Sequence, residues 1–252
     1  KLEGSGDNKI IMEGLELQRN LGMSLASTLK NEVGMSMRAM GPATSRPVIR
    51  GLSGERISIR QDNNNISDLS ATSPDHAVTV DPSVMEHVEV IRGPRSLTKS
   101  GNSAGGIINI ISNDIPSELQ NGIRGNFGSY AESANKGYSG MVSLSVPLHS
   151  IIFKFEADKR KTANLKTADG ELNNSSLDNF GFSSGIAYVE SNGFAGIAIR
   201  EYNSSYGVPG GFIGAHPKGV DIDMFKRVIT GKGEYNIEDK YINKIDVDFS
   251  RS

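Results

Sequence analysis

The chain has 252 residues, no cysteine, and a net charge of −2 from 27 basic and 29 acidic residues. This length allows one large domain or two small ones. The mixed charges form no clustered basic run, so a nucleic-acid partner is not expected. No apolar run approaches the roughly 18 residues of a transmembrane helix.

The aromatic residues divide the chain into two parts. All 9 Phe and 7 Tyr residues lie at or after Phe127, and the preceding segment has none. Aromatic side chains usually supply part of a soluble core, so the two parts indicate two environments. We place a first domain at residues 1–118 and a second at 119–252, with the boundary near Ile115-Pro116-Ser117.

The first domain reads as a small α/β unit. Leu21, Leu25 and Leu29 recur every four residues, which predicts a short amphipathic helix through Lys30. Asp81-Pro82 places a capping residue before proline, so a helical turn is expected there. Short strands are expected at Met35–Met37, Pro47–Ile49, Ile57–Ile59, Val88–Ile91 and Ile107–Ile111.

The second domain alternates apolar and polar residues with a period of two, which is typical of strands. Most segments reach the roughly 9–11 residues that a strand needs to cross a membrane. The expected strands are Ile123–Phe127, Tyr138–Val146, Ile151–Asp158, Phe180–Val189, Phe194–Tyr202, Met224–Ile237 and Tyr241–Phe249.

Short and long connections alternate between these strands. The turns at Pro147–Ser150, Glu190–Gly193 and near Ile237–Lys240 are short, whereas the connections at Ser129–Lys136, Lys161–Asp178 and Asn203–Asp221 are longer. This rhythm is expected of a membrane barrel with one external rim. A soluble β-sandwich would also alternate its faces, but it explains the loop rhythm less well.

Four motifs lie in order between Arg46 and Ile111. They are Arg46–Ile59 with its Arg-Gly pair, Ser73–Val78, Val88–Leu97 with Arg-Gly-Pro, and Gly105–Ile111. Together they resemble the plug domain of the TonB-dependent outer-membrane receptors, which import scarce nutrients through a plugged β-barrel. The resemblance implies an α/β plug domain followed by the N-terminal strands of an antiparallel transmembrane β-barrel, in the outer membrane of a Gram-negative bacterium.

The resemblance also assigns structural residues. In the family, the matching elements help the plug to dock in the barrel lumen, where arginines can form forked hydrogen bonds to wall carboxylates. The positions here are Arg50, Gly51, Glu89, Arg92, Gly93, Gly105, Gly106 and Asn109. The local pattern alone leaves open an ordinary α/β domain in which the glycines only make turns. Asp62-Asn63 stands where the family usually has Asp-Gly, and asparagine tolerates positive φ well.

Seven strands cannot close such a barrel, which has about 22 strands when complete. At the spacing seen here, 22 strands would need roughly 420 residues, far more than residues 119–252 supply. The chain also has no initiating Met and no secretory leader. We therefore expect a trimmed part of a longer receptor.

No catalytic constellation is present: a phosphate-loop motif, His-Glu-x-x-His and Cys-x-x-Cys are all absent. An enzyme is not expected, and no resident cofactor is required. The run from Ser67 to Val78 is similar to the plug apex of a zinc-uptake subgroup of these receptors. The resemblance makes Asp75 and His76 candidate ligands for zinc or another metal as cargo. The alternative is that both residues only cap the turn before Asp81.

An external loop supplies the other candidate substrate contacts. The element Tyr206-Gly-Val-Pro-Gly210 matches the zinc-linked subgroup, but the loop after it holds only His216 where that subgroup is rich in histidine. Tyr206, Phe212 and His216 are therefore candidate substrate-binding residues. Five methionines, Met12, Met23, Met35, Met37 and Met40, could ligate copper, although packing in an aromatic-free core is favoured.

The resemblance implies a transporter whose partners are the TonB energy-transducing complex, outer-membrane lipid and a metal, metal chelate or vitamin-like substrate. The TonB complex would pull on a segment before the plug, which we do not identify within Lys1–Glu13. The alternative is a non-transporting surface receptor or adhesin built on the same scaffold. Neither reading involves nucleic acid.

Overall fold

The computed structural model describes residues 9–22, 24–66, 69–71, 73, 76–78, 80, 82, 85–93, 96–97, 103–211, 216–237 and 243–252. The chain forms two compact units. The first comprises Lys1–Ser112, Asn164–Ser176 and Tyr206–Asp221, and the second comprises Asn113–Ala163, Leu177–Ser205 and Ile222–Ser252. The main division follows Ser112, and two connecting segments of the later chain join the first unit.

The first unit contains a five-stranded sheet among its described residues. Its order is β1 (Lys9–Glu13), β6 (His87–Ile91), β7 (Gly106–Ile111), β4 (Ile57–Gln61) and β5 (Asn64–Asn65). Strands β4 and β7 run parallel, whereas β1 and β6, β6 and β7, and β4 and β5 pair antiparallel. A separate hairpin joins β2 (Met35–Ala39) to β3 (Ser45–Ile49), and 3-10 turns lie at Gly54–Arg56 and Leu69–Ala71. The strands predicted from sequence are confirmed, while the two edge strands β1 and β5 were not predicted.

The helical prediction was wrong in its boundaries. Helix α1 spans Gly14–Asn20, and helix α2 begins only at Leu25 and ends at Leu29. Ser24 sets this start, because its hydroxyl accepts from the Ser27 N–H at 3.1 Å while the Ser27 hydroxyl accepts from the Ser24 N–H at 2.8 Å. The turn expected at Asp81-Pro82 lies largely outside the described residues. No helix in the described part of the chain is long and apolar enough to span a membrane.

Aliphatic side chains fill the core of the first unit. Helix α2 contributes Leu25 and Leu29, and the central strands contribute Val88, Val90, Ile108 and Ile110, all of them fully buried. Met12 and Met35 also pack in this core, as predicted. Met37 and Met40, at 41% and 48% exposure, do not, because only the first residue of β2 is buried. Met23 lies outside the described residues.

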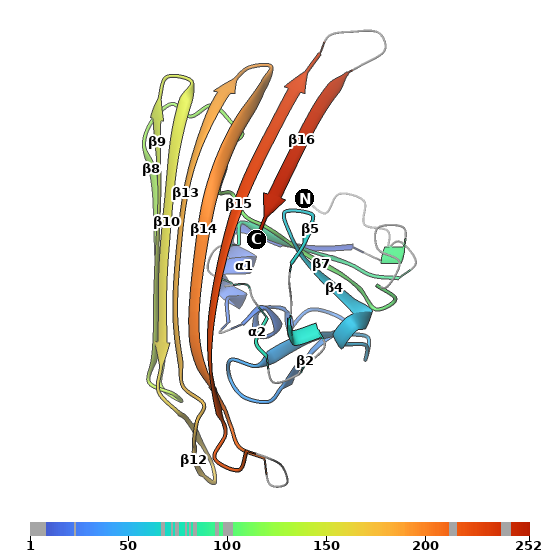
Figure 1. The fold of residues 1–252 in the computed structure, drawn as a ribbon, viewed down its shortest axis with the longest axis vertical. Coiled ribbons are helices and arrows are strands. Elements are labelled where there is room, and N and C mark those ends of the chain that lie inside the picture. Colours follow the sequence, from blue (N-terminus) through green and yellow to red (C-terminus); the bar gives the residue numbers. More distant parts are fainter. Residues whose placement is uncertain are drawn as a thin grey trace. The chain divides into compact units, whose positions relative to one another are not determined.

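The second unit is built on a seven-stranded antiparallel sheet, counted over the residues the structure describes, whose strands stand side by side in Figure 1. All seven strands predicted from sequence are present, and neighbours in the chain pair in order. They are β8 (Arg124–Glu132), β9 (Gly137–Leu148), β10 (Ile151–Thr162), β13 (Leu177–Glu190), β14 (Gly193–Val208), β15 (Val220–Asn236) and β16 (Lys244–Arg251).

Two of the predicted loops were drawn too long. Strands β14 and β15 continue into the segment Asn203–Asp221, so only 209–219 connects them. The segment Lys161–Asp178 contains a small hairpin of β11 (Leu165–Thr167) and β12 (Gly170–Leu172). In both cases polar residues were taken as loop, although polar segments here also form paired strands.

The two faces of the large sheet have opposite character. Phe127, Val142 and Ala157 lie in register across β8, β9 and β10, and their face exposes Phe127 at 75% and Val142 at 51%. The buried side chains of the other face are largely polar: Lys154, Asp158, Arg160, Asn179, Ser183 and Arg200. A water-soluble protein buries its apolar face instead. The observed arrangement is the one expected when lipid covers the outer face.

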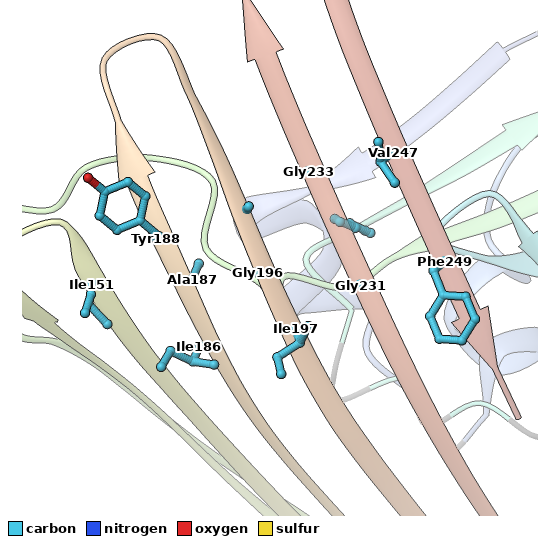
Figure 2. Close-up of a pocket in the computed structure, with 12 residues that line it drawn as sticks. Ile151, Ile186, Ala187, Tyr188, Gly196, Ile197, Gly231, Gly233, Val247 and Phe249 are labelled. Carbon is cyan, nitrogen blue, oxygen red and sulfur yellow. The ribbon is translucent and has the colours of Figure 1, made fainter.

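A groove of about 630 Å³ opens on this apolar face (Figure 2). Gly231 and Gly233 of β15 pair with Phe249 and Val247 of β16, so the missing side chains leave a gap beside two large ones. Ile151, Ile186, Tyr188 and Ile197 line the rest of the groove. Its lining also includes Lys232 but is almost entirely apolar, so we treat the groove as part of that face.

Candidate functional site

The first unit ties the segment after His76 to the end of strand β14. The Ala77 N–H donates a 2.9 Å hydrogen bond to the Tyr206 hydroxyl, and the Tyr206 side chain is only 3% exposed. On the other side, Val78 and Val80 are buried in the aliphatic core. The half-buried His76 donates its own N–H to the Ser73 carbonyl at 3.2 Å. The structure therefore brings the predicted residues His76 and Tyr206 close together.

Asn174 connects the segment Asn164–Ser176 to the end of β14 and the start of β15. Its side-chain amide donates to the carbonyls of Val208 and Val220, at 3.0 Å each, and its φ is 57°. The Gly207 N–H adds a 3.0 Å bond to the Ser176 carbonyl. Sequence reasoning missed Asn174, although asparagine in a polar run is a candidate for the left-handed conformation. These bonds hold the chain next to Tyr206 in place.

The tip of the β2–β3 hairpin lies at the same place. A Cβ atom on Gly41 would stand 2.9 Å from the Pro209 ring, so the hairpin tip packs directly against the end of β14. We define the apex as this tip (residues 40–44), the described residues of 76–80, and residues 206–209. Met40 and His76 give the apex a thioether and an imidazole that are not fully buried.

The remaining predicted contacts are less defined. His216 is exposed, and its carbonyl accepts a 3.0 Å hydrogen bond from the Gly219 N–H. Asp75 and Phe212 lie outside the described residues. Within the described residues, no three His, Cys, Asp or Glu side chains gather into a metal site. Zinc sites commonly use three or four protein ligands, so the apex by itself supplies only part of such a set.

The Arg-Gly elements form turns within the first unit. Arg50 and Gly51 have φ values of 49° and 82°, and Ile49 and Leu52 exchange two backbone hydrogen bonds of 2.9 Å across them. The Arg92 guanidinium donates to the Val33 carbonyl at 2.6 Å, and Gly93 follows with a φ of 73°. The turn-forming role that the local pattern left open is therefore present, and docking to a barrel wall stays a prediction.

Glu89 and Asn109 also have partners inside the first unit. Burial raises the pKa of Glu89, but the Lys9 ammonium at 2.9 Å outweighs it and holds that pKa below its ordinary value. The Asn109 amide exchanges bonds of 2.9 and 3.0 Å with Asn63, whose φ of 65° confirms that the Asp-Asn turn adopts the conformation usual for Asp-Gly. Gly105 bonds the Arg56 carbonyl at 2.8 Å, which brings the two backbones into close approach.

A buried ion cluster on the polar face of the large sheet was not predicted. Arg200 of β14 binds both Asp114 and Glu156, and Lys154 lies 3.1 Å from Glu156. The alternating charges of β10 were visible in the sequence, but the cluster also needs Asp114 and Arg200, which are 86 residues apart along the chain. All of these residues belong to the second unit.

Comparison with known proteins agrees with this architecture. Residues 7–107 match the family model of the TonB-dependent Receptor Plug Domain. Among solved structures, the copper transporter OprC superposes with a TM-score of 0.80 at 13% identity, covering 96% of this chain and 36% of that one. The FrpB iron transporter from Neisseria meningitidis (F3-3 variant) gives 0.75 at 14%, covering 97% and 40%.

A variant of the ferric enterobactin receptor PfeA from Pseudomonas aeruginosa, in complex with enterobactin, gives a TM-score of 0.73 at 14% identity, covering 98% of this chain and 41% of that one. The chain thus spans less than half the length of the structures that it matches. At these identities the likeness concerns the fold. The predicted fold class, a plug domain followed by the first strands of an incomplete antiparallel barrel, is confirmed.

Proposed function

We propose that this chain is the plug and first seven strands of an outer-membrane receptor that binds a scarce nutrient at the apex and imports it with TonB-transduced energy. The observation that carries the proposal is the inverted large sheet, with its apolar face exposed and its polar face buried, directly after a plug domain. The solved structures of similar fold are named as transporters and receptors. No enzymatic step is part of the proposal.

The N-terminal strand is suited to being pulled. Strand β1 lies at the edge of the five-stranded sheet and pairs only with β6 within that sheet. A force applied before Lys9 would remove this edge strand before it reached the buried central strands β6 and β7. Each backbone hydrogen bond contributes only about 0.5–1.5 kcal/mol net. The edge strand can therefore yield to a pull while the central sheet stays folded.

Uptake into cells tests the transport proposal. Cells that express the full-length receptor are expected to accumulate radiolabelled cargo, zinc in the first instance, and to lose this accumulation when TonB is deleted. Uptake should depend on TonB because, in this proposal, the plug opens only when TonB supplies energy. Accumulation that persists without TonB would contradict energised import. Surface binding of the cargo without uptake in either strain would favour the alternative, a non-transporting surface receptor or adhesin.

The apex makes a metal-bearing cargo the first to test. Calorimetric titration of Zn²⁺ into the full-length, detergent-purified receptor is expected to show saturable binding that the Asp75→Ala/His76→Ala variant loses. Mutating a group that only supports a metal ligand already weakens metal binding by about tenfold or more, so loss of the ligands themselves should cost at least about 1.4 kcal/mol. His149→Asn is the matched control, because His149 occupies the β9–β10 turn with a φ of 58° that asparagine adopts readily. Equal affinity in all three proteins would reduce Asp75 and His76 to turn-capping residues.

Copper is the second candidate cargo. The exposed thioethers of Met37 and Met40 favour it, since thioethers are soft ligands for Cu(I), and the structure named as a copper transporter has the same fold. The same titration repeated with Cu(I), on wild type and Met40→Leu, separates this cargo from zinc. If Met40→Leu leaves the affinity for Cu(I) unchanged, Met40 is not a copper ligand.

A further inference from the structure

The segment Asn113–Ile115 leads the chain out of the first unit and is held against the polar face of the large sheet. Arg200 grips Asp114 with two nitrogens: its Nε donates to Asp114 Oδ2 at 2.9 Å, and its Nη2 donates to Oδ1. Ser183 adds a 3.0 Å bond to the same carboxylate. The Lys154 ammonium binds the Asn113 carbonyl. Side chains of β10, β13 and β14 therefore hold two consecutive residues.

Two glycines of the large sheet leave the space in which this segment lies. A Cβ atom at Gly185 would fall on the Asp114 carbonyl, so only glycine lets the segment lie flat on β13. A Cβ at Gly196 would stand 2.6 Å from the Ile115 Cγ2 atom. Ile115 itself is buried in an apolar cluster with Ile152, Ala187, Val189 and Ala198. Ionic contacts, close backbone fit and apolar packing thus all hold the segment Asn113–Ile115.

The buried ion pair between Asp114 and Arg200 is costly to separate. Burial opposes ionisation of Asp114, but the Arg200 charge and its hydrogen bonds outweigh burial and hold the pKa of Asp114 below its ordinary value. The carboxylate therefore stays charged at neutral pH. Arg200 also bonds Glu156 at 2.9 Å, which fixes the guanidinium from its other side. Pulling the segment away would leave the buried charge of Arg200 without its partner Asp114, which is strongly unfavourable.

We propose that Asn113–Ile115 is a clamp that fixes the C-terminal end of the plug to the barrel wall, so that energised rearrangement of the plug is confined to residues before Asn113. This inference rests on the proposed transport function for its purpose. Its geometry belongs to the second unit alone. The clamp lets the plug be pulled from its N-terminus without being drawn out as a whole, because the force ends at a charged and sterically fitted anchor.

A unique thiol tests the clamp without requiring transport. The chain has no cysteine, so Ile115→Cys introduces a single reporter in the full-length, detergent-purified receptor. The thiol is expected to react slowly with maleimide, and about a hundredfold faster in the Arg200→Met and Gly185→Val backgrounds. Lys159→Met is the control, since it removes an ion pair with Asp178 on the exposed face, and should leave the rate unchanged.

A rate that Arg200→Met and Gly185→Val both leave unchanged overturns the clamp. If Arg200→Met fails to fold, Asp114→Asn takes its place, because it removes the charge and keeps the shape, and the same criterion applies. Force spectroscopy of the bilayer-embedded receptor, pulled from its N-terminus, supplies the second measurement. The extension should stop with Ser112 in wild type, and should run to Ile123, about 35 Å further, when the clamp is broken. Equal extensions would also overturn the clamp, whatever the uptake assay shows.

Discussion

Replacing Gly106 by alanine is expected to destabilise the first unit by about 4 kcal/mol. Gly106 has a φ of 142°, a conformation that side chains rarely adopt, and a Cβ there would lie 2.7 Å from the Ile91 carbonyl oxygen and 2.9 Å from the Ile49 Cδ1 atom. Backbone strain of this kind costs about 1–3 kcal/mol, and overpacking of a core costs about as much again. Both neighbours are buried, so neither can move aside cheaply.

Hydrogen exchange of strands β6 and β7 in the full-length receptor measures this loss. Domains are typically stable by about 5–15 kcal/mol, so protection of these amides should fall by several orders of magnitude. Gly51→Ala is the matched control: its φ is 82°, but nothing lies within 4 Å of the added Cβ. It should cost only about 1 kcal/mol. An equal loss in both variants would mean that backbone strain, and not the crowding at Gly106, governs the effect.

The longer strands of the second unit and the central strands of the first could be predicted from sequence because their signals are local. Alternation along Tyr138–Val146 or Ile151–Asp158 is set by which face each side chain occupies, and every residue of the strand repeats the information. The glycine-rich motifs of the plug behave similarly, since a turn such as Arg50-Gly51 is decided by its own φ values. The inverted faces of the sheet follow from the same alternation once lipid is the solvent.

The contacts that build the apex and the buried ion cluster could not be predicted, because they join distant parts of the chain. The Tyr206 hydroxyl accepts from an amide 129 residues away, and Asp114 meets Arg200 across 86 residues. Neither pair leaves a periodic signal. The predicted start of helix α2 was wrong for a local reason. Three evenly spaced leucines predicted a helix from Leu21, but the capping bonds between Ser24 and Ser27 make the helix begin at Leu25. Strand β1 is held by long-range contacts, because it pairs with β6 and buries Met12 in the core of the first unit.

An arginine at Val142 is expected to cost about 2–4 kcal/mol of folding free energy in a bilayer. Val142 stands in the middle of β9 with its side chain on the apolar face, beside Phe127 and Ala157. If lipid covers that face, the guanidinium has neither water nor a carboxylate beside it. Denaturant-dependent folding of the full-length receptor into lipid vesicles measures the penalty, and assembly into the outer membrane should fall in parallel.

Ser143→Arg is the matched control, one residue along the same strand and on the opposite face. Its register partner is Glu156, and the Ser143 hydroxyl already lies 3.3 Å from that carboxylate. An arginine there gains an acidic neighbour on a polar face, so its cost should stay within about 1 kcal/mol. The pair of variants separates the two architectures that alternation alone permits. In a soluble sandwich the exposed Val142 would accept arginine freely, and a penalty confined to Ser143 would contradict the membrane assignment of this sheet.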